Sequence, residues 1–153
     1  MMRAGMKTIG RALLLTGASV AAWLFVVRME EQPGPTAEVG CVVSYVYDGD
    51  TVALSCDGRE ERARLVGFDT PETRNARCEA EAVAGKDATE RLRALIAKGG
   101  VAFTRHGTDK YGRSLIRLSV GGVDVAETMI REDYAVAYSA GTRIDWCHKL
   151  EAA

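Results

Sequence analysis

The chain has 153 residues, of which 47% are hydrophobic and 27% are charged. This length suffices for one domain with a hydrophobic core and excludes two. Four of the 20 basic residues and none of the 21 acidic residues lie in residues 1–28, so residues 29–153 carry a net charge of −5. This acidic balance counts against a protein that holds long duplex nucleic acid tightly by neutralising its phosphates.

Residues 1–28 are predicted to be a membrane-targeting segment. Three basic residues precede the uncharged stretch 12–27 and one follows it, a bias that places the N-terminus in the cytosol and the rest of the chain outside it. Two alternatives remain open. An uncleaved signal anchor fits because flanking arginines can extend a run slightly short of about 20 residues. A cleaved signal peptide needs a small-residue site, and residues 19–22 offer one.

The exported part begins with a polar tether, residues 29–37, and continues as one domain, residues 38–153. Asp48-Gly49 lies between two runs of β-branched and aromatic residues and predicts a hairpin with a type I′ turn. Asp57-Gly58 predicts a second turn. Three consecutive antiparallel strands are therefore expected, at residues 42–47, 51–56 and 62–68.

Apolar spacing and turn signals predict the remaining elements. They are a helix at residues 81–98, strands at 101–104 and 114–120, a short helix capped by Asp124, a strand at 134–138 and a last helical stretch within 142–150. The pattern predicts an α+β fold, mainly β: a five-stranded OB-fold-like, partly open barrel with two or three helices.

Four cysteines in an exported domain predict disulfides, with three possible pairings. In the predicted hairpin Cys41 lies opposite Cys56, at a spacing that a disulfide can bridge. The remaining pair is then Cys78 with Cys147. Packed, unpaired thiols are the alternative interpretation.

Two carboxylates are predicted to lie near the same end of adjacent strands. Asp50 begins the second strand and Asp69 leaves the third. Two oxygen donors with no cysteine or histidine beside them favour a hard cation such as Ca²⁺ over zinc.

Three further residues indicate which reaction the site could carry out. Glu72 lies close enough to Asp69 to reach a water at the cation, as a general base must. Arg64 and Arg113 are planar forks that can hold phosphate oxygens. Each residue alone is compatible with a solvated turn or a surface ion pair. Together they predict metal-assisted phosphodiester hydrolysis.

The stretches YDGDTV (47–52), RLVGFDTPET (64–73) and TDKYGR (108–113) resemble the staphylococcal nuclease (thermonuclease) family over about residues 40–140. The resemblance implies an OB-fold with added helices and Ca²⁺-dependent hydrolysis of DNA and RNA that leaves 3′-phosphate ends. The implied roles are Ca²⁺ binding by Asp50, Asp69 and the Thr70 carbonyl, general base catalysis by Glu72, phosphate stabilisation by Arg64 and Arg113, and substrate contacts by Lys110, Tyr111 and Tyr138.

Two other classes of function remain open from the sequence: a catalytically silent OB module that binds nucleic acid or protein at the membrane, and a structural domain stabilised by Ca²⁺. The intact set of carboxylates and arginines favours the nuclease. No protein partner is implied and a monomer is expected. The chain ends soon after Tyr138, which distinguishes it from the staphylococcal enzyme with its long C-terminal helix.

Overall fold

The computed structural model describes residues 40–152. The predicted membrane-targeting segment and tether lie outside this range. Among the described residues, no helix has both the length and the apolar character needed to cross a membrane.

Eleven secondary-structure elements make up the described part of the chain. The strands are β1 (Cys41–Asp48), β2 (Thr51–Cys56), β3 (Arg59–Leu65), β4 (Gly67–Asp69), β5 (Val101–Thr108), β6 (Ser114–Val120), β7 (Val123–Asp124) and β8 (Val136–Tyr138), and the helices are α2 (Glu79–Ile96), α3 (Val125–Arg131) and α4 (Trp146–Glu151).

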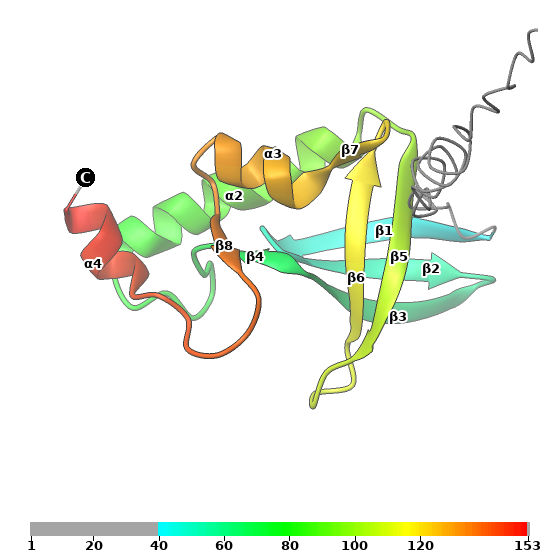
Figure 1. Cartoon of the computed structure of the whole chain (residues 1–153), viewed down its shortest axis with the longest axis horizontal. Helices are drawn as coiled ribbons and strands as arrows, with labels where there is room; N and C mark the ends of the chain where they lie inside the picture. The colour runs from blue at the N-terminus through cyan, green and yellow to red at the C-terminus, as the bar shows by residue number, and fades with distance from the viewer. Residues whose placement is uncertain (1–39, 153) are drawn as a thin grey trace, which may run out of the picture. The chain divides into compact units, whose positions relative to one another are not determined.

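The main sheet has the order β1-β2-β3-β6-β5, with β7 added to β6. The first three strands form the expected antiparallel meander, and β3 pairs with β6 in parallel. Figure 1 shows β1, β2 and β3 side by side, with β5 and β6 running steeply across them and α2 and α3 on one side. No ladder joins β1 to β5 among the described residues. This mainly-β, open sheet agrees with the predicted OB-like class.

The core lies between the curved sheet and the helices. Its fully buried side chains include Val52, Leu54, Leu65, Phe68, Leu92, Ile116 and Met129. Several alternate along β2, β3 and β6, which is how a strand directs one face inward. Burial of these side chains fixes the strand ends from which the polar residues project.

The predicted strand 62–68 is wrong in its second half. β3 ends at Leu65, and β4 pairs with β8 in a separate two-stranded sheet. Gly67 has a φ of 97°, a conformation that side-chain-bearing residues rarely adopt. The chain therefore leaves the main sheet here, and it carries Asp69 toward the C-terminal segment.

The predicted type I′ turn is also wrong. Asp48 pairs with Thr51, so Gly49 and Asp50 form the loop, and two register shifts within β1 bring Cys41 opposite Cys56. Gly49 is not one of the described glycines that have a positive φ. Its role is close packing, because a Cβ there would lie 2.8 Å from Thr70 Oγ1 and 2.9 Å from the Ala88 Cβ.

The capping and disulfide predictions are confirmed. The Asp124 carboxylate accepts a hydrogen bond from the backbone N–H of Glu127 at 3.1 Å and begins α3. The disulfides join Cys41 to Cys56 and Cys78 to Cys147.

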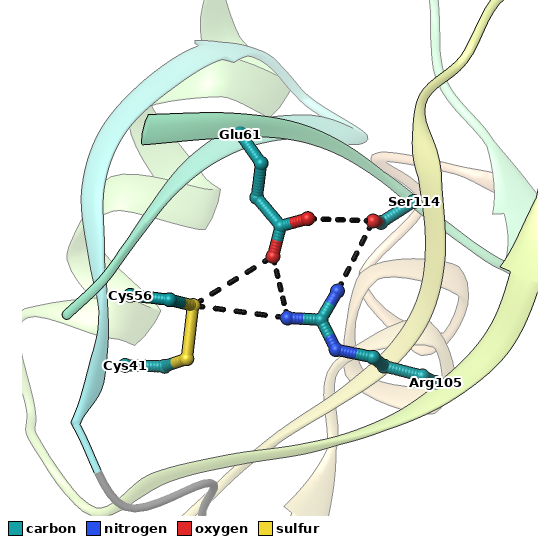
Figure 2. Close-up of a disulfide and its surroundings, with 5 residues drawn as sticks. All are labelled: Cys41, Cys56, Glu61, Arg105 and Ser114. Atoms are coloured by element: carbon teal, nitrogen blue, oxygen red, sulfur yellow. Dashed lines mark hydrogen bonds and ion pairs between the residues drawn. A yellow bond between two sulfur atoms is a disulfide. The ribbon is translucent and has the colours of Figure 1, made fainter. Parts of the chain in front are cut away.

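The Cys41–Cys56 disulfide belongs to a cluster to which every strand of the main path contributes one residue (Figure 2). Glu61 of β3 lies 2.5 Å from the Arg105 guanidinium of β5 and accepts a hydrogen bond of 2.8 Å from Ser114 at the start of β6. Arg105 also lies 3.7 Å from the Cys56 sulfur. We call this group the Glu61 cluster. It links β5 by side chains to strands with which β5 shares no ladder.

Candidate active site

Asp50 and Asp69 come together as predicted, bridged by one arginine. Asp50 lies in the β1–β2 turn and Asp69 ends β4, with exposed fractions of 2% and 0%. Arg64 of β3 contacts Asp50 through Nη1 and lies 3.1 Å from Asp69 Oδ1 through Nη2. The ladder places Arg64 opposite Thr51, directly after Asp50, so the meander itself sets this contact.

Thr70 adds polar contacts to Asp50. Its backbone N–H and its hydroxyl donate to Asp50 Oδ2 at 3.2 and 3.1 Å. Burial raises the pKa of Asp50 to about 7, although Arg64 opposes the rise; Asp48 and Asp69 add to it. The Arg64 guanidinium therefore does not fully compensate the burial of the Asp50 carboxylate.

Glu72 is positioned by α2. Glu81, 4% exposed, accepts hydrogen bonds from the backbone N–H groups of Glu72 at 3.3 Å and Arg77 at 2.8 Å. Gly85 permits a close approach, because a Cβ there would lie 2.5 Å from the Glu72 carbonyl oxygen. The residues after Asp69 thus pack directly on the helix, which holds Glu72 beside the aspartates.

Arg143 reaches the same place from the segment between β8 and α4. Its Nε lies 2.7 Å from Asp69 Oδ1, its Nη1 contacts Glu72 Oε1, and its Nη2 donates to the Thr70 carbonyl at 2.9 Å. Burial lowers the pKa of Arg143, but the contacts with Glu72 and Asp69 outweigh burial and raise it overall. Arg143 therefore contacts Asp69, Thr70 and Glu72, three of the four residues expected to bind the cation or its water.

Trp146 supplies another contact that the sequence did not predict. Its indole Nε1 donates to Asp69 Oδ2 at 2.9 Å, and its side chain is buried. The Cys78–Cys147 disulfide joins this segment to the start of α2. Two cysteines 69 positions apart were the only sequence signal that residues near 143–147 return to the site.

Two clefts meet at Arg64, Glu72 and Arg113. The first, here the Tyr138 cleft, has a volume of about 570 Å³ and contains all the predicted substrate residues, Lys110, Tyr111 and Tyr138. The second, here the Tyr47 cleft, has a volume of about 290 Å³ and extends over β1–β3.

The arginine of the β5–β6 loop is held by its own turn. Arg113 Nε donates to Asp109 Oδ2 at 2.7 Å, and the guanidinium lies 5.6 Å from the Tyr111 ring. The Tyr138 hydroxyl donates to the Gly141 carbonyl at 2.7 Å. The structure thus brings all the predicted catalytic and substrate residues to one face, while their roles remain predictions.

The donor set fits a hard cation. Asp50, Asp69 and the Thr70 carbonyl offer only oxygen, and the raised pKa of Asp50 indicates that additional positive charge would stabilise its ionised form. Cys78, Glu81 and Cys147 also lie close enough together for a metal, but the two sulfurs are joined in a disulfide. Thiolate ligands are therefore not available there.

Comparison with known proteins agrees with this geometry. The family model described as staphylococcal nuclease homologue matches residues 62–152. The chain belongs to this family. The matched range contains Arg64, Asp69, Glu72 and Arg113, while Asp50 lies before it.

Three relatives illustrate the similarity. Endonuclease YncB of Bacillus subtilis (strain 168) is 33% identical over 65% of this chain and 49% of the relative. The thermonuclease of Staphylococcus intermedius is 37% identical over 52% of this chain and 48% of the relative. The thermonuclease of Staphylococcus hyicus is 26% identical over 97% of this chain and 92% of the relative. The chain therefore spans about half the length of the first two.

Proposed function

We propose that this protein is a nuclease that hydrolyses phosphodiester bonds of DNA, RNA or both with Ca²⁺ as cofactor. The observation that carries the proposal is the direct contact of Arg64 with Asp50 and Asp69, beside Glu72 and Arg113 in the same clefts. Family membership and relatives named thermonuclease and endonuclease support it.

In this proposal Asp50, Asp69 and the Thr70 carbonyl would hold Ca²⁺, which when bound offsets the negative charge of carboxylates and phosphate. Glu72 accepts the proton of the attacking water. Its side chain is partly exposed, so water reaches it, and its backbone is fixed by Glu81.

Arg64 and Arg113 stabilise the phosphate as negative charge develops on its oxygens. Both border each cleft, so a phosphate at the junction lies within reach of either guanidinium. The bond from phosphorus to the 5′-oxygen breaks, the 5′-oxygen takes a proton from solvent water and leaves as a hydroxyl group, and the phosphate stays on the 3′-oxygen. Lys110, Tyr111 and Tyr138 bind the nucleotide on one side, through charge and ring stacking.

We further propose that the domain works on the outer side of the cytoplasmic membrane, either anchored or secreted. The uncharged stretch 12–27 with its basic flanks supports export. Two disulfides and the lack of a free cysteine in residues 40–152 suit an oxidising compartment.

The test uses the oxidised full chain in mild detergent with fluorescent single-stranded DNA or RNA, in Ca²⁺ or in chelator. We expect cleavage only with Ca²⁺, and a loss of several orders of magnitude in Glu72→Gln. Glu90→Gln, an exposed change on α2, is the matched control. No cleavage by the unaltered chain, with the oligonucleotide still bound, would instead indicate a silent binding module.

A further inference from the structure

The part of the Tyr47 cleft beyond Arg64, Glu72 and Arg113 has no role in the reaction as proposed above. It shares Arg64, Glu72 and Arg113 with the Tyr138 cleft and continues from them over the outer face of the meander toward Tyr47, Arg62 and Arg74. A ligand phosphate at the shared residues therefore has a lined cleft on both sides.

Tyr47 and Arg62 make a cation–π contact in this cleft. The Arg62 guanidinium lies 4.1 Å from the centre of the Tyr47 ring, and Tyr45 packs edge-on against the same ring with 5.0 Å between centroids. Stacked arginine–tyrosine pairs present a planar, cationic face on which an unpaired base can stack. Tyr45 holds the tyrosine in place, and Arg62 is exposed.

The charge of the cleft opposes that of the chain. Arg62 and Arg74 are exposed, and neither has a carboxylate partner within residues 40–152. Arg62 and Arg64 are two positions apart on β3, so their side chains leave the same face of the strand. A local row of guanidinium groups thus borders the catalytic arginine, although residues 29–153 are acidic overall. Such a patch attracts phosphates despite an unfavourable net charge.

We propose that the Tyr47 cleft binds a second nucleotide of a single-stranded substrate, on the side of the cleaved phosphate opposite to the nucleotide held by Tyr111 and Tyr138. The base stacks on the Tyr47–Arg62 pair, and Arg62 or Arg74 contacts the next phosphate. This inference rests on the proposed function for the position of the cleaved bond. A substrate that fills both clefts has a nucleotide on each side of the cleaved phosphate, so the protein would cut within a strand. The Tyr47 cleft would also favour single strands, since a duplex keeps its bases stacked on one another.

The experiment measures binding separately from cleavage. Full chain carrying Glu72→Gln is titrated with fluorescein-labelled dT6 in Ca²⁺, with a thymidine mononucleotide as competitor and a six-base-pair duplex as comparison. Tyr47→Ala should weaken dT6 binding about 5- to 100-fold, the range for loss of one base–aromatic stack, and change mononucleotide binding less than 2-fold. Arg62→Gln should weaken dT6 binding and reduce its salt slope by about 0.7, the value for one lost phosphate contact.

Arg131→Gln on α3 removes the same charge away from both clefts and should leave dT6 binding unchanged. Equal loss of dT6 affinity in Arg131→Gln and Arg62→Gln, or unchanged dT6 affinity in both cleft variants, would overturn the inference. So would duplex binding as tight as that of dT6. Cleavage of long single-stranded DNA by the chain with Glu72 intact is measured in parallel. Absence of that cleavage would reject the proposed function, while a selective loss of dT6 affinity would still support the cleft as a strand-binding site.

Discussion

Each of the two disulfides lies near a group of arginine and carboxylate side chains. The carboxylate of one group is partly exposed, and the carboxylates of the other are buried. Cys41–Cys56 closes a 15-residue separation and belongs to the half-exposed Glu61 cluster, which joins strands of the sheet. Cys78–Cys147 closes a separation of 69 and ties the segment bearing Arg143 and Trp146 to the buried aspartates.

Burial explains the difference in charge state. At the Glu61 cluster the hydrogen bond from Arg105 is the largest effect and lowers the pKa of Glu61, although burial opposes it. At Asp50 burial is the largest effect and raises the pKa despite a contacting arginine. An arginine–carboxylate pair therefore stabilises the sheet at Glu61, while the pair at Asp50 favours the binding of a further cation.

The largest expected effect is the loss of stability on removing a disulfide, and it should differ between the two. Replacing Cys78 and Cys147 by serine should lower the free energy of unfolding by about 4 kcal/mol, against about 3 kcal/mol for Cys41 and Cys56, because the longer closed loop restricts the unfolded chain more. Urea denaturation of the oxidised full chain measures both. A larger loss for the shorter loop would show that the Glu61 cluster depends on its disulfide more than chain entropy explains.

Removing the bridging arginine should be nearly as costly. Arg64→Met leaves Asp50 and Asp69 buried with less compensation, and we expect a loss of about 3 kcal/mol in chelator. Ca²⁺ should stabilise both chains, since it binds only the folded site, and it should stabilise Arg64→Met more, because the positive charge that repels the cation is gone. Urea denaturation with and without Ca²⁺ gives both values. No stabilisation of either chain by Ca²⁺ would contradict cation binding by these aspartates.

Arg143 offers a test of competition at the site. A divalent cation about 6 Å from a guanidinium is repelled by about 1.4 kcal/mol even at the dielectric constant of water. Arg143→Gln should therefore lower the Kd for Ca²⁺ about 10-fold in calorimetric titration, while Arg131→Gln leaves it unchanged. Weaker Ca²⁺ binding in Arg143→Gln would show that the arginine orients the ligands instead of opposing the cation.

The smallest expected effect concerns Glu61. Because its folded pKa is lowered, its ion pair stabilises the fold above the pKa of an unfolded glutamate, about 4.3, and this contribution is lost as pH falls through the folded value. The stability advantage of the unaltered chain over Glu61→Gln should be below about 1 kcal/mol at pH 7 and should fall toward zero as the pH drops below the folded pKa of Glu61. Thermal unfolding of both chains across this pH range measures the advantage, and an advantage that does not decrease as the pH falls would contradict a stabilising ion pair at Glu61.

Local sequence signals predicted what depends on neighbours in the chain. Asp124 caps α3 because its carboxylate is close to the next backbone N–H groups, and the strand at 114–120 follows from alternation alone. The turn at Gly49 was misplaced because tertiary packing against Thr70 and Ala88, and not its φ, selects glycine there. The break at Gly67 was missed because pairing of β4 with β8 joins segments far apart in sequence.

The sequence by itself determined the meander and the residue types of a nuclease site, since these follow from periodicity, turn residues and three recognisable stretches, and it favoured one of three disulfide pairings. Only the tertiary structure decided which charged and polar side chains contact one another. Arg143 and Trp146 contact Asp69 from a segment without a motif, Glu81 fixes Glu72 from a helix, and Arg62 stacks on Tyr47 across the sheet. Such contacts depend on packing between distant elements and on burial, which no local pattern encodes.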